Sequence, residues 1–318
     1  MITIKNLRTI QGDIEKEYVV ESQESQVIDA RERLTLFPAL IDTHVHFPTD
    51  KKGDWESGAK AAITGGVTTV FQTSSSDSFE GLKSNLTSID RFLKEISIPL
   101  RYRLYFPGSA THLGEMDKLT DEVVGLKVVL APGVDDSFLE EVFRTASQKN
   151  LPIAIQLEEA QAIESIQNVL HQARSYPCPL YFLNIRTQDQ LDIIQKAKHE
   201  EILVYTGVKA SDLLADTSDV LWQAINEDII DTVGCGDPDF ITLPLLLNAA
   251  GENRISYEKV VALTKRGPQE IFNLQNQDDL VLVDLEKEKS IGSGLRLKGW
   301  PEYTIIQGKA FHVASADF

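Results

Sequence analysis

FPALIDTHVHFP, at residues 37–48, opens the part of the chain that decides its fold. This stretch is an apolar run that ends in two histidines, and a longer segment with helical periodicity follows it. The same alternation between a short apolar run and a helical segment continues to residue 278. Repeated βα units of this kind are typical of a parallel sheet.

We count eight strand-like runs in this region. They cover residues 39–47, 67–72, 100–106, 123–130, 153–157, 180–185, 202–206 and 229–235. Helical segments separate them, for example at residues 55–64, 137–149, 188–199 and 215–226. Because the number of units and a length of about 250 residues both fit a closed barrel, the sequence predicts an α/β fold with a TIM-type (β/α)8 barrel over residues 37–278.

The two ends of the chain follow a different pattern. Residues 1–36 and 279–318 hold short alternating runs such as ITIKNL and YTIIQGKAFHV. Such runs are typical of antiparallel strands. We therefore expect the two ends to form a small β-sandwich together.

Composition excludes several classes of protein. The chain has 318 residues, of which 42% are hydrophobic and 25% charged, and this is typical of a folded globular protein. Its net charge of −17 argues against a nucleic-acid partner. No apolar run reaches the length of about 20 residues that a membrane span needs, so we expect a cytoplasmic protein with no membrane partner. Cys178 and Cys235 have no CxxC spacing, and we expect both to be reduced core thiols.

The first strand of the barrel ends in the pattern His44-x-His46. Side chains two residues apart on a strand point to the same side, so both imidazoles would face the barrel mouth, where active sites of such barrels lie. Two imidazoles at this spacing can bind one metal ion, and Asp42 shares their face. The alternative is that His44 and His46 are packed or surface histidines.

Several stretches of the sequence resemble the dihydroorotase family of cyclic amidohydrolases. LIDTHVHF at residues 40–47 and WESGAKAAITGGVTTV at residues 55–70 resemble the opening of the family's barrel. VGLKVVL at residues 124–130 resembles its fourth strand, and residues 243–274 resemble the helices after its eighth strand. DLVLVDLEKE at residues 279–288 and YTIIQGKAFH at residues 303–312 resemble its sandwich strands.

This resemblance covers nearly the whole chain and implies an activity as well as a fold. The implied reaction is the metal-assisted hydrolysis or formation of a ring amide, as in pyrimidine biosynthesis. In the family, one or two zinc ions activate water and polarise the amide carbonyl, while an aspartate on the last strand moves the proton.

The resemblance assigns three metal-binding positions that this chain retains. His44 and His46 match the first two ligands, and Lys127 matches a bridging lysine that relatives carry as a carbamate. Carbamate formation needs a neutral amine, and a lysine within an apolar strand has the lowered pKa that favours it. Alternatively, Lys127 is a buried lysine paired with an inward carboxylate such as Glu158.

Other positions depart from the family's pattern. Gln156 and Asn184 end the fifth and sixth strands, where relatives carry histidine ligands, and amides bind zinc poorly. The catalytic aspartate of the family aligns with Gly236, and only a shift of one residue brings Asp237 to that position.

The substrate positions depart as well. Relatives hold the carboxylate of dihydroorotate with an arginine and an asparagine, which correspond here to Pro48 and approximately Ser75. Proline cannot replace the paired hydrogen bonds of an arginine, so we expect dihydroorotate to bind badly. Ser75, Gln156 and Asn184 are the side chains that we expect to face a substrate.

The number of histidines limits the metal content. The family's two-metal site uses four histidines, and the chain has six, namely His44, His46, His112, His171, His199 and His312. We expect the last three on the surface, while His112 either reaches the barrel mouth or is a loop histidine. The sequence therefore predicts at most one zinc or other divalent ion, and none if His44 and His46 serve only in packing.

Two functions of different class follow from these observations. The chain is either a dihydroorotase-like hydrolase of reduced or altered activity on a small cyclic amide, or an inactive homologue that serves as a structural partner, for instance of aspartate carbamoyltransferase. In both cases we expect a homodimer or a complex with another pyrimidine-pathway enzyme.

Overall fold

A computed structural model describes most of the chain. The described residues are 1–47, 51–76, 78–108, 123–130, 135–157, 163–216, 218–234, 236, 240–275, 277–292 and 294–314. Cys235 lies outside them, and Cys178 is a buried free thiol, as the sequence predicts. Among these residues, no helix combines the length and the apolar character that crossing a bilayer requires.

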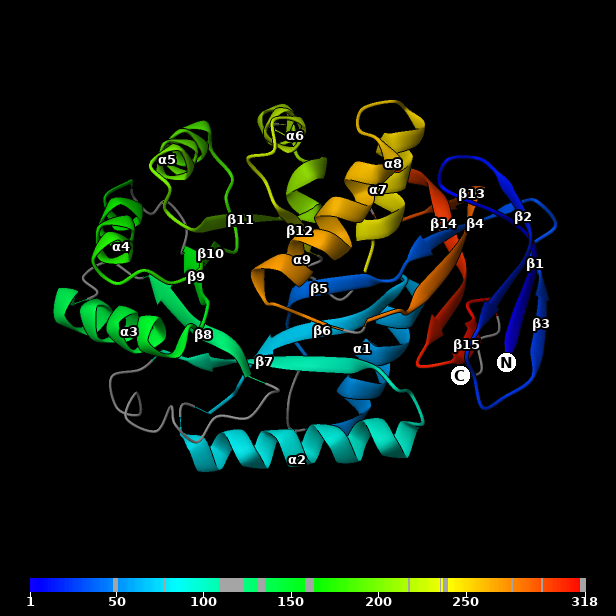
Figure 1. The fold of residues 1–318 in the computed structure, drawn as a ribbon, viewed down its shortest axis with the longest axis horizontal. Coiled ribbons are helices and arrows are strands. Elements are labelled where there is room, and N and C mark those ends of the chain that lie inside the picture. Colours follow the sequence, from blue (N-terminus) through cyan, green and yellow to red (C-terminus); the bar gives the residue numbers. More distant parts are fainter. Residues whose placement is uncertain are drawn as a thin grey trace.

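Eight parallel strands form the barrel, and they pair in chain order (Figure 1). They are β5 (Leu40–Val45), β6 (Val67–Thr73), β7 (Arg101–Pro107), β8 (Val123–Leu130), β9 (Ile153–Leu157), β10 (Leu180–Phe182), β11 (Val204–Lys209) and β12 (Thr232–Gly234). The last strand, β12, contacts the first, β5, which brings the barrel nearly to closure. A Cβ atom at Gly234 would lie 3.0 Å from Asp42 Oδ1, so this approach suits glycine. The predicted barrel is confirmed.

Helices surround the barrel. They are α1 (Lys52–Thr64), α2 (Phe79–Ile96), α3 (Asp136–Lys149), α4 (Ile163–Ser175), α5 (Gln188–His199), α6 (Asp219–Asn226), α7 (Thr242–Gly251), α8 (Tyr257–Val261) and α9 (Gly267–Ile271). Helix α3 shows why these segments are helical, because it buries residues at helical spacing, namely Leu139, Val142, Phe143 and Ala146.

One helix begins later than the sequence indicated. The helical segment predicted at residues 215–226 starts at Asp219, because Ala210–Leu214 forms a separate 3₁₀ helix, η2, after β11. By contrast, α5 begins and ends where predicted. Its start is fixed by a capping box, in which Thr187 and Gln190 bind each other's backbone N–H groups.

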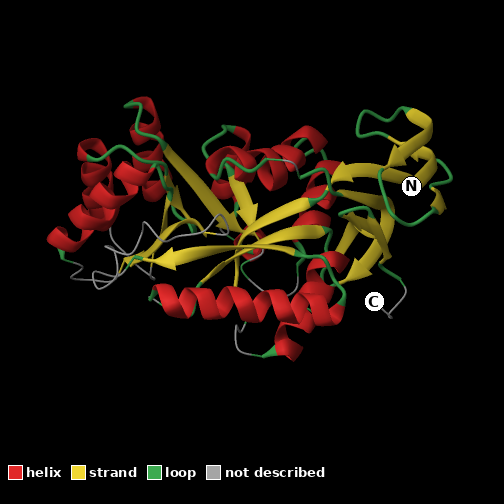
Figure 2. Ribbon diagram, turned by 60° about the horizontal axis from the view of Figure 1, so that its bottom comes forward, coloured by secondary structure: helices red, strands yellow, loops and turns green. Residues whose placement is uncertain are grey.

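Segments near the two ends of the chain form one sheet beside the barrel (Figure 1). Its strands are β1 (Ile2–Arg8), β2 (Ile14–Val20), β3 (Gln26–Asp29), β4 (Leu34–Pro38), β13 (Leu280–Ser290), β14 (Arg296–Ile306) and β15 (Lys309–His312). A separate apolar cluster fills this curled sheet, with Ile4 and Leu7 from the first strand packed near Leu282 and Ile305 from the last ones. Figure 2 shows this sheet at one end of the molecule, with the barrel strands crossing between the helices.

Aromatic rings fill the middle of the barrel. The ring of Phe272, just after α9, lies 4.8 Å from that of Phe71, 5.5 Å from that of Tyr181 and 5.9 Å from that of Tyr105, measured between centroids. All four side chains are buried. The mouth, at the carboxyl ends of the strands, is therefore separated from the floor, at their amino ends, by a packed layer.

Candidate active site

The two histidines of the His44-x-His46 pattern meet at the barrel mouth. Their ring centroids lie 4.5 Å apart with an interplanar angle of 71°. His44 is only 4% exposed, whereas His46, just beyond β5, is exposed. The backbone N–H of His44 donates to Asp42 Oδ1 over 3.0 Å. Asp42 therefore fixes the backbone from Asp42 to His44.

Lys127 reaches the same place from β8. Its Nζ atom lies 3.1 Å from His44 Nε2, and its side chain is buried. Burial, and then the charge of Lys209, lowers the pKa of Lys127 to about 8. Burial also lowers the pKa of His44 well below its ordinary value, and the charge of Lys127 adds to this effect. A neutral His44 therefore accepts a hydrogen bond from the Lys127 amine.

This assignment fixes the proton on the other ring nitrogen of His44. If Nε2 accepts from Lys127, Nδ1 carries the hydrogen. Nδ1 is buried and has no hydrogen-bond partner among the described residues. The alternative partner that we considered for Lys127, Glu158, lies outside those residues.

Hydroxyl groups support this strand end from below. Thr43 Oγ1 lies 2.8 Å from Tyr181 Oη, which in turn lies 2.6 Å from Thr232 Oγ1. Tyr105 Oη donates to the Thr43 carbonyl over 2.9 Å. Burial raises the pKa of Tyr181 to about 12, and it also raises that of Tyr105, so both phenols stay protonated at neutral pH. The network holds the backbone before His44 in place.

The residues expected to face a substrate lie on separate strand ends. Gln156 is half-buried on β9, and Asn184 is half-buried two residues after β10. Asn184 Oδ1 is buried and has no hydrogen-bond partner in the described part of the chain. Ser75 is exposed after β6, and its hydroxyl lies 3.0 Å from Asn85 Nδ2 on α2. Ser75 is thus already engaged by a neighbouring helix.

Two other candidates, His112 and Asp237, lie outside the described residues. Of the histidines expected on the surface, His171 and His199 are exposed, while His312 is half-buried and stacks on Tyr303 with centroids 4.7 Å apart. The stacking explains the partial burial, since an imidazole on the terminal sheet can cover a neighbouring ring.

Sequence reasoning missed two residues at the mouth. Gln72 on β6 accepts from the Phe47 backbone N–H over 3.0 Å and donates to its carbonyl, so it fixes the segment after His46. Lys209 ends β11, and its charge lowers the pKa of both Lys127 and His44. For Lys209 the sequence did hold a signal. Side chains alternate along β11, so Lys209 lies on the same face of that strand as Tyr205 and Gly207.

The donors at the mouth do not fit a two-metal centre. Within the described residues, no three His, Cys, Asp or Glu side chains come together. A metal ion between a Lys127 carbamate and His44 would need bonds of about 2.0 Å on either side in addition to the carbamate group. The 3.1 Å between Lys127 Nζ and His44 Nε2 leaves no room for them. Amide side chains at Gln156 and Asn184 would not replace the missing imidazoles.

Comparisons with known proteins agree with this fold. Residues 35–311 match the model of the amidohydrolase family. The chain belongs to this family. It is 23% identical to a dihydroorotase of Methanosphaera stadtmanae, over 87% of this chain and 83% of that protein. It is also 23% identical to the multifunctional protein CAD of Squalus acanthias, over 88% of this chain but only 15% of that much longer protein.

Two solved structures have the same fold as this amidohydrolase. The L-hydantoinase from Arthrobacter aurescens superposes with a TM-score of 0.80 at 20% identity, over 97% of this chain and 95% of that one. An inactive dihydroorotase-like domain of a CAD-like multifunctional protein from Chaetomium thermophilum superposes with a TM-score of 0.76 at 18% identity, over 87% and 94%. These two structures show that the fold is shared, while the family match and the relatives named dihydroorotase and L-hydantoinase indicate a cyclic amidohydrolase of that type.

Proposed function

We propose that this amidohydrolase is a non-catalytic relative of dihydroorotase that keeps the barrel as a structural partner for an enzyme of pyrimidine biosynthesis. The contact between Lys127 Nζ and His44 Nε2 carries the proposal. Through this contact, the two residues at the family's metal-ligand positions bind each other, so neither group is directed at a metal ion or a substrate.

The neighbouring residues support the same conclusion. Gln156 and Asn184 are amides at strand ends where the family resemblance calls for imidazoles. Each zinc-activated water needs about three protein ligands, and the described mouth offers two imidazoles. Loss of the metal and of an arginine clamp removes several kcal/mol of transition-state stabilisation, and each 1.4 kcal/mol is about a tenfold loss of rate.

Kinship supports the choice of partner. Relatives of this chain include multifunctional proteins, and one structural neighbour is an inactive dihydroorotase-like domain of such a protein. A cytoplasmic complex with aspartate carbamoyltransferase, or a homodimer that docks onto it, would give an inactive barrel a role.

A second candidate is a hydrolase that uses a single divalent ion. The adjacent rings of His44 and His46 favour it, since they could share one ion once Lys127 withdrew. Its substrate would be a small cyclic amide other than dihydroorotate.

Metal analysis and assays distinguish these two candidates. Protein purified without chelator is to be analysed for zinc, and then assayed with dihydroorotate, hydantoin and allantoin in the presence of added zinc. We expect less than one zinc per chain and no turnover above a matched preparation of the His44→Ala, Lys127→Met variant. Turnover near the typical enzyme value of about 10 per second would refute the non-catalytic proposal.

A further inference from the structure

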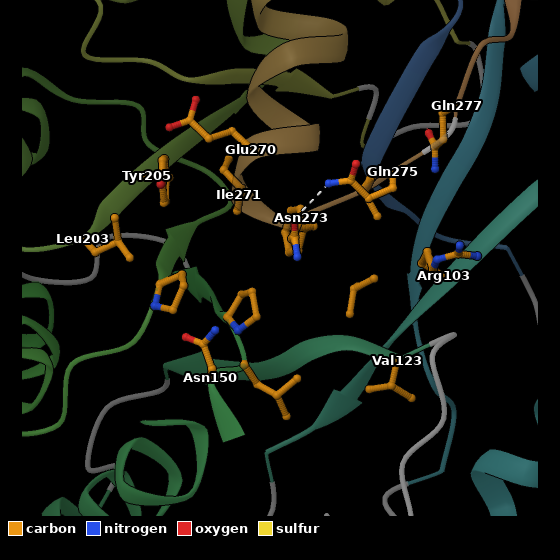
Figure 3. A pocket seen from close by; sticks show the side chains of 16 residues that line it. Arg103, Val123, Asn150, Leu203, Tyr205, Glu270, Ile271, Asn273, Gln275 and Gln277 are labelled. Atoms are coloured by element: carbon orange, nitrogen blue, oxygen red, sulfur yellow. Dashed lines mark hydrogen bonds between the residues drawn. The ribbon is translucent and has the colours of Figure 1, made fainter. Parts of the chain in front are cut away.

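Two cavities of this molecule differ in the side chains that line them. The larger, of about 730 Å³, lies at the floor of the barrel (Figure 3). Arg103 and Glu270 belong to its lining, but both charged groups point away from its interior, which leaves mainly amide and apolar side chains there. The smaller cavity, of about 420 Å³, lies between the end of β2 and the start of β13. It adjoins a strand with an unusual degree of exposure.

Strand β2 has one free edge. The terminal sheet runs in the order β15-β14-β13-β4-β1-β2, and β1 pairs with β2 from Ile14, opposite Arg8, to Val20, opposite Ile2. No other described backbone group bonds to the backbone of residues 14–20. Figure 1 shows β2 at the end of the molecule away from α3 and α4. Its outer edge therefore presents unpaired N–H and C=O groups, which can pair with a further strand.

The strand at the opposite end of the sheet, β15, is shorter and more engaged. It has four residues. Lys309 at its start donates to the Ser97 carbonyl over 3.1 Å, and His312 at its end stacks on Tyr303. Strand β2 has seven residues, and five of them are exposed. Of the two end strands, β2 is the one that offers a long edge.

Exposed apolar side chains accompany this edge. Val19 of β2 is 47% exposed and Val27 of β3 is 63% exposed. Both stand opposite Thr3 of β1, so the three side chains form one row across the outer face of the sheet. Ile14, at the start of β2, is exposed as well. A strand added to the edge of β2 would cover part of this apolar surface, which favours association.

The charges on β2 determine which strand fits its edge. Glu15 and Glu17 are exposed on one face of β2, and Lys16 is exposed on the other. None of the three forms an ion pair among the described residues. A second copy of β2, paired in antiparallel about Glu17 or about Lys16, would place glutamate directly opposite glutamate, and like charges in that position are destabilising. The edge thus disfavours its own copy and favours a strand with basic side chains opposite the two glutamates.

The cavity at the end of β2 has the same preference. Glu21 and Asp278 line it, and both are exposed. Arg101 is the one basic residue among the described residues that line it, and it is already paired with Asp279. The charge that remains is negative, so a basic side chain near the amino end of an antiparallel incoming strand would be attracted there.

We propose that the free edge of β2 takes up a strand of a partner protein in antiparallel orientation. This strand carries basic side chains opposite Glu15 and Glu17, an acidic one opposite Lys16, and apolar ones opposite Ile14 and Val19. Main-chain hydrogen bonds along the edge supply affinity, and the side chains supply specificity. The surface belongs to the terminal sheet and not to the barrel mouth, so it is independent of the function proposed for the mouth.

Fluorescence anisotropy with the whole chain tests the proposal. The matched probe is a labelled peptide with blocked ends that carries these side chains at the opposite positions. In the reversed probe, every charge has the other sign. We expect the matched probe to bind and the reversed probe to bind at least tenfold more weakly. The triple variant Glu15→Lys, Lys16→Glu, Glu17→Lys should exchange this preference, because it exchanges the charges on the edge.

Two further probes distinguish strand addition from a purely electrostatic contact. Both are matched probes in which alternate peptide nitrogens are methylated, at the odd positions in one and at the even positions in the other. Alternate residues of an antiparallel strand direct their N–H groups to the same side. One methylated probe should therefore lose at least tenfold in affinity, and the other should bind much as the matched probe does.

Matched variants control for indirect effects. Glu80→Lys on α2 and Glu164→Lys on α4 reverse exposed charges outside the terminal sheet, and they should leave all affinities unchanged. Should the triple variant fail to fold, judged by circular dichroism, Glu17→Gln should weaken the matched probe and strengthen the reversed one.

Three results would overturn the proposal. The matched probe does not bind at millimolar concentration, the reversed probe binds wild type as tightly, or both methylated probes bind as tightly as the matched one. Sedimentation of the chain alone gives a further check. If wild type dimerises and the matched probe dissociates the dimer, the edge of β2 serves a second copy of this chain and the proposal is wrong.

Discussion

At the mouth of the barrel Lys127 and His44 bind each other, whereas at the floor Arg103 and Glu270 line a cavity, and Arg103 donates to the Tyr102 carbonyl. Both ends are built by the same eight strands, and both place charged groups on inward positions. The difference lies in burial, because Lys127 and His44 are buried, whereas Arg103 is half-buried and Glu270 is exposed. A buried charged or polar group needs a partner within the protein, whereas an exposed one is solvated by water.

The largest effect is expected from the residue that separates the two ends. Phe272 is 7% exposed and contacts Phe71, Tyr105 and Tyr181. Phe272→Ala should lower the free energy of unfolding by about 3–5 kcal/mol, through lost burial and the cavity left behind. Urea denaturation measures this, and Phe272→Leu should cost clearly less. A loss below 1 kcal/mol for the alanine variant would mean that the middle layer is not a packed partition.

A smaller effect is expected from the buried amine at the mouth. The pKa of Lys127 is lowered from 10.5 to about 8 by burial, so the unfolded chain binds the proton more tightly than the folded one. Between about pH 8 and 10.5 the unfolded state therefore holds more protons, and stability rises with pH. Below pH 8 the charged amine costs the folded state its full penalty.

Lys127→Met should therefore flatten the rise in the free energy of unfolding between pH 7 and pH 9.5, and its gain at pH 7 is reduced because His44 Nε2 loses its donor. Lys265 is the matched case near the floor. Its pKa is also lowered to about 8 by burial, but its Nζ donates to the Gln277 carbonyl over 2.6 Å. Lys265→Met should flatten the same rise, and its gain at pH 7 is likewise reduced because the Gln277 carbonyl loses its donor. An unchanged slope in Lys127→Met would contradict this account of the mouth.

The sequence predicted the barrel because its signal is local and repeated. Strand β8 and strand β9 were predicted to the residue, since each is a short apolar run between helical segments. The late start of α6 was not predictable from propensity, because the preceding residues form a separate turn after β11. The nearness of His44 and His46 also followed from strand geometry alone.

What the sequence left open depends on contacts between distant strands. Two partners for Lys127 were considered, a carbamate with its metal or a carboxylate, and the described structure brings it to His44 instead. Spacing along one strand cannot tell which side chain of another strand lies 3 Å away. The floor cavity was missed for the same reason, since its lining residues come from several strands and from the region of α9, which lie far apart in the chain.

A gain of metal binding would sharpen the contrast between mouth and floor. The double change Gln156→His, Asn184→His restores imidazoles at the two strand ends where amides stand. We expect zinc affinity to rise at least tenfold over wild type, since neutral imidazole is a far better zinc ligand than an amide. Equilibrium dialysis measures the zinc affinity. The double variant Gln156→Leu, Asn184→Leu is the control, because it changes the same two positions without adding a ligand. If the zinc affinity did not rise, the contact between Lys127 and His44 would persist even with histidines at positions 156 and 184.

The smallest effect is expected from the exposed histidine. His46 contacts the ring of His44, but its own side chain is exposed, so His46→Ala should change the free energy of unfolding by no more than about 0.5 kcal/mol. If the barrel serves as a structural partner, sedimentation of the variant alone and with aspartate carbamoyltransferase should match that of wild type, because one imidazole at the mouth contributes little to the outer helices, through which we expect the subunits to associate. If a single metal ion at the mouth drives hydrolysis, the same well-folded variant should lose its zinc and its activity. Complementation of a strain that lacks dihydroorotase separates these outcomes, and we expect no growth with either protein. Rescue by wild type alone would establish that the mouth is catalytic. It would also mean that a metal ion displaces the contact between Lys127 and His44.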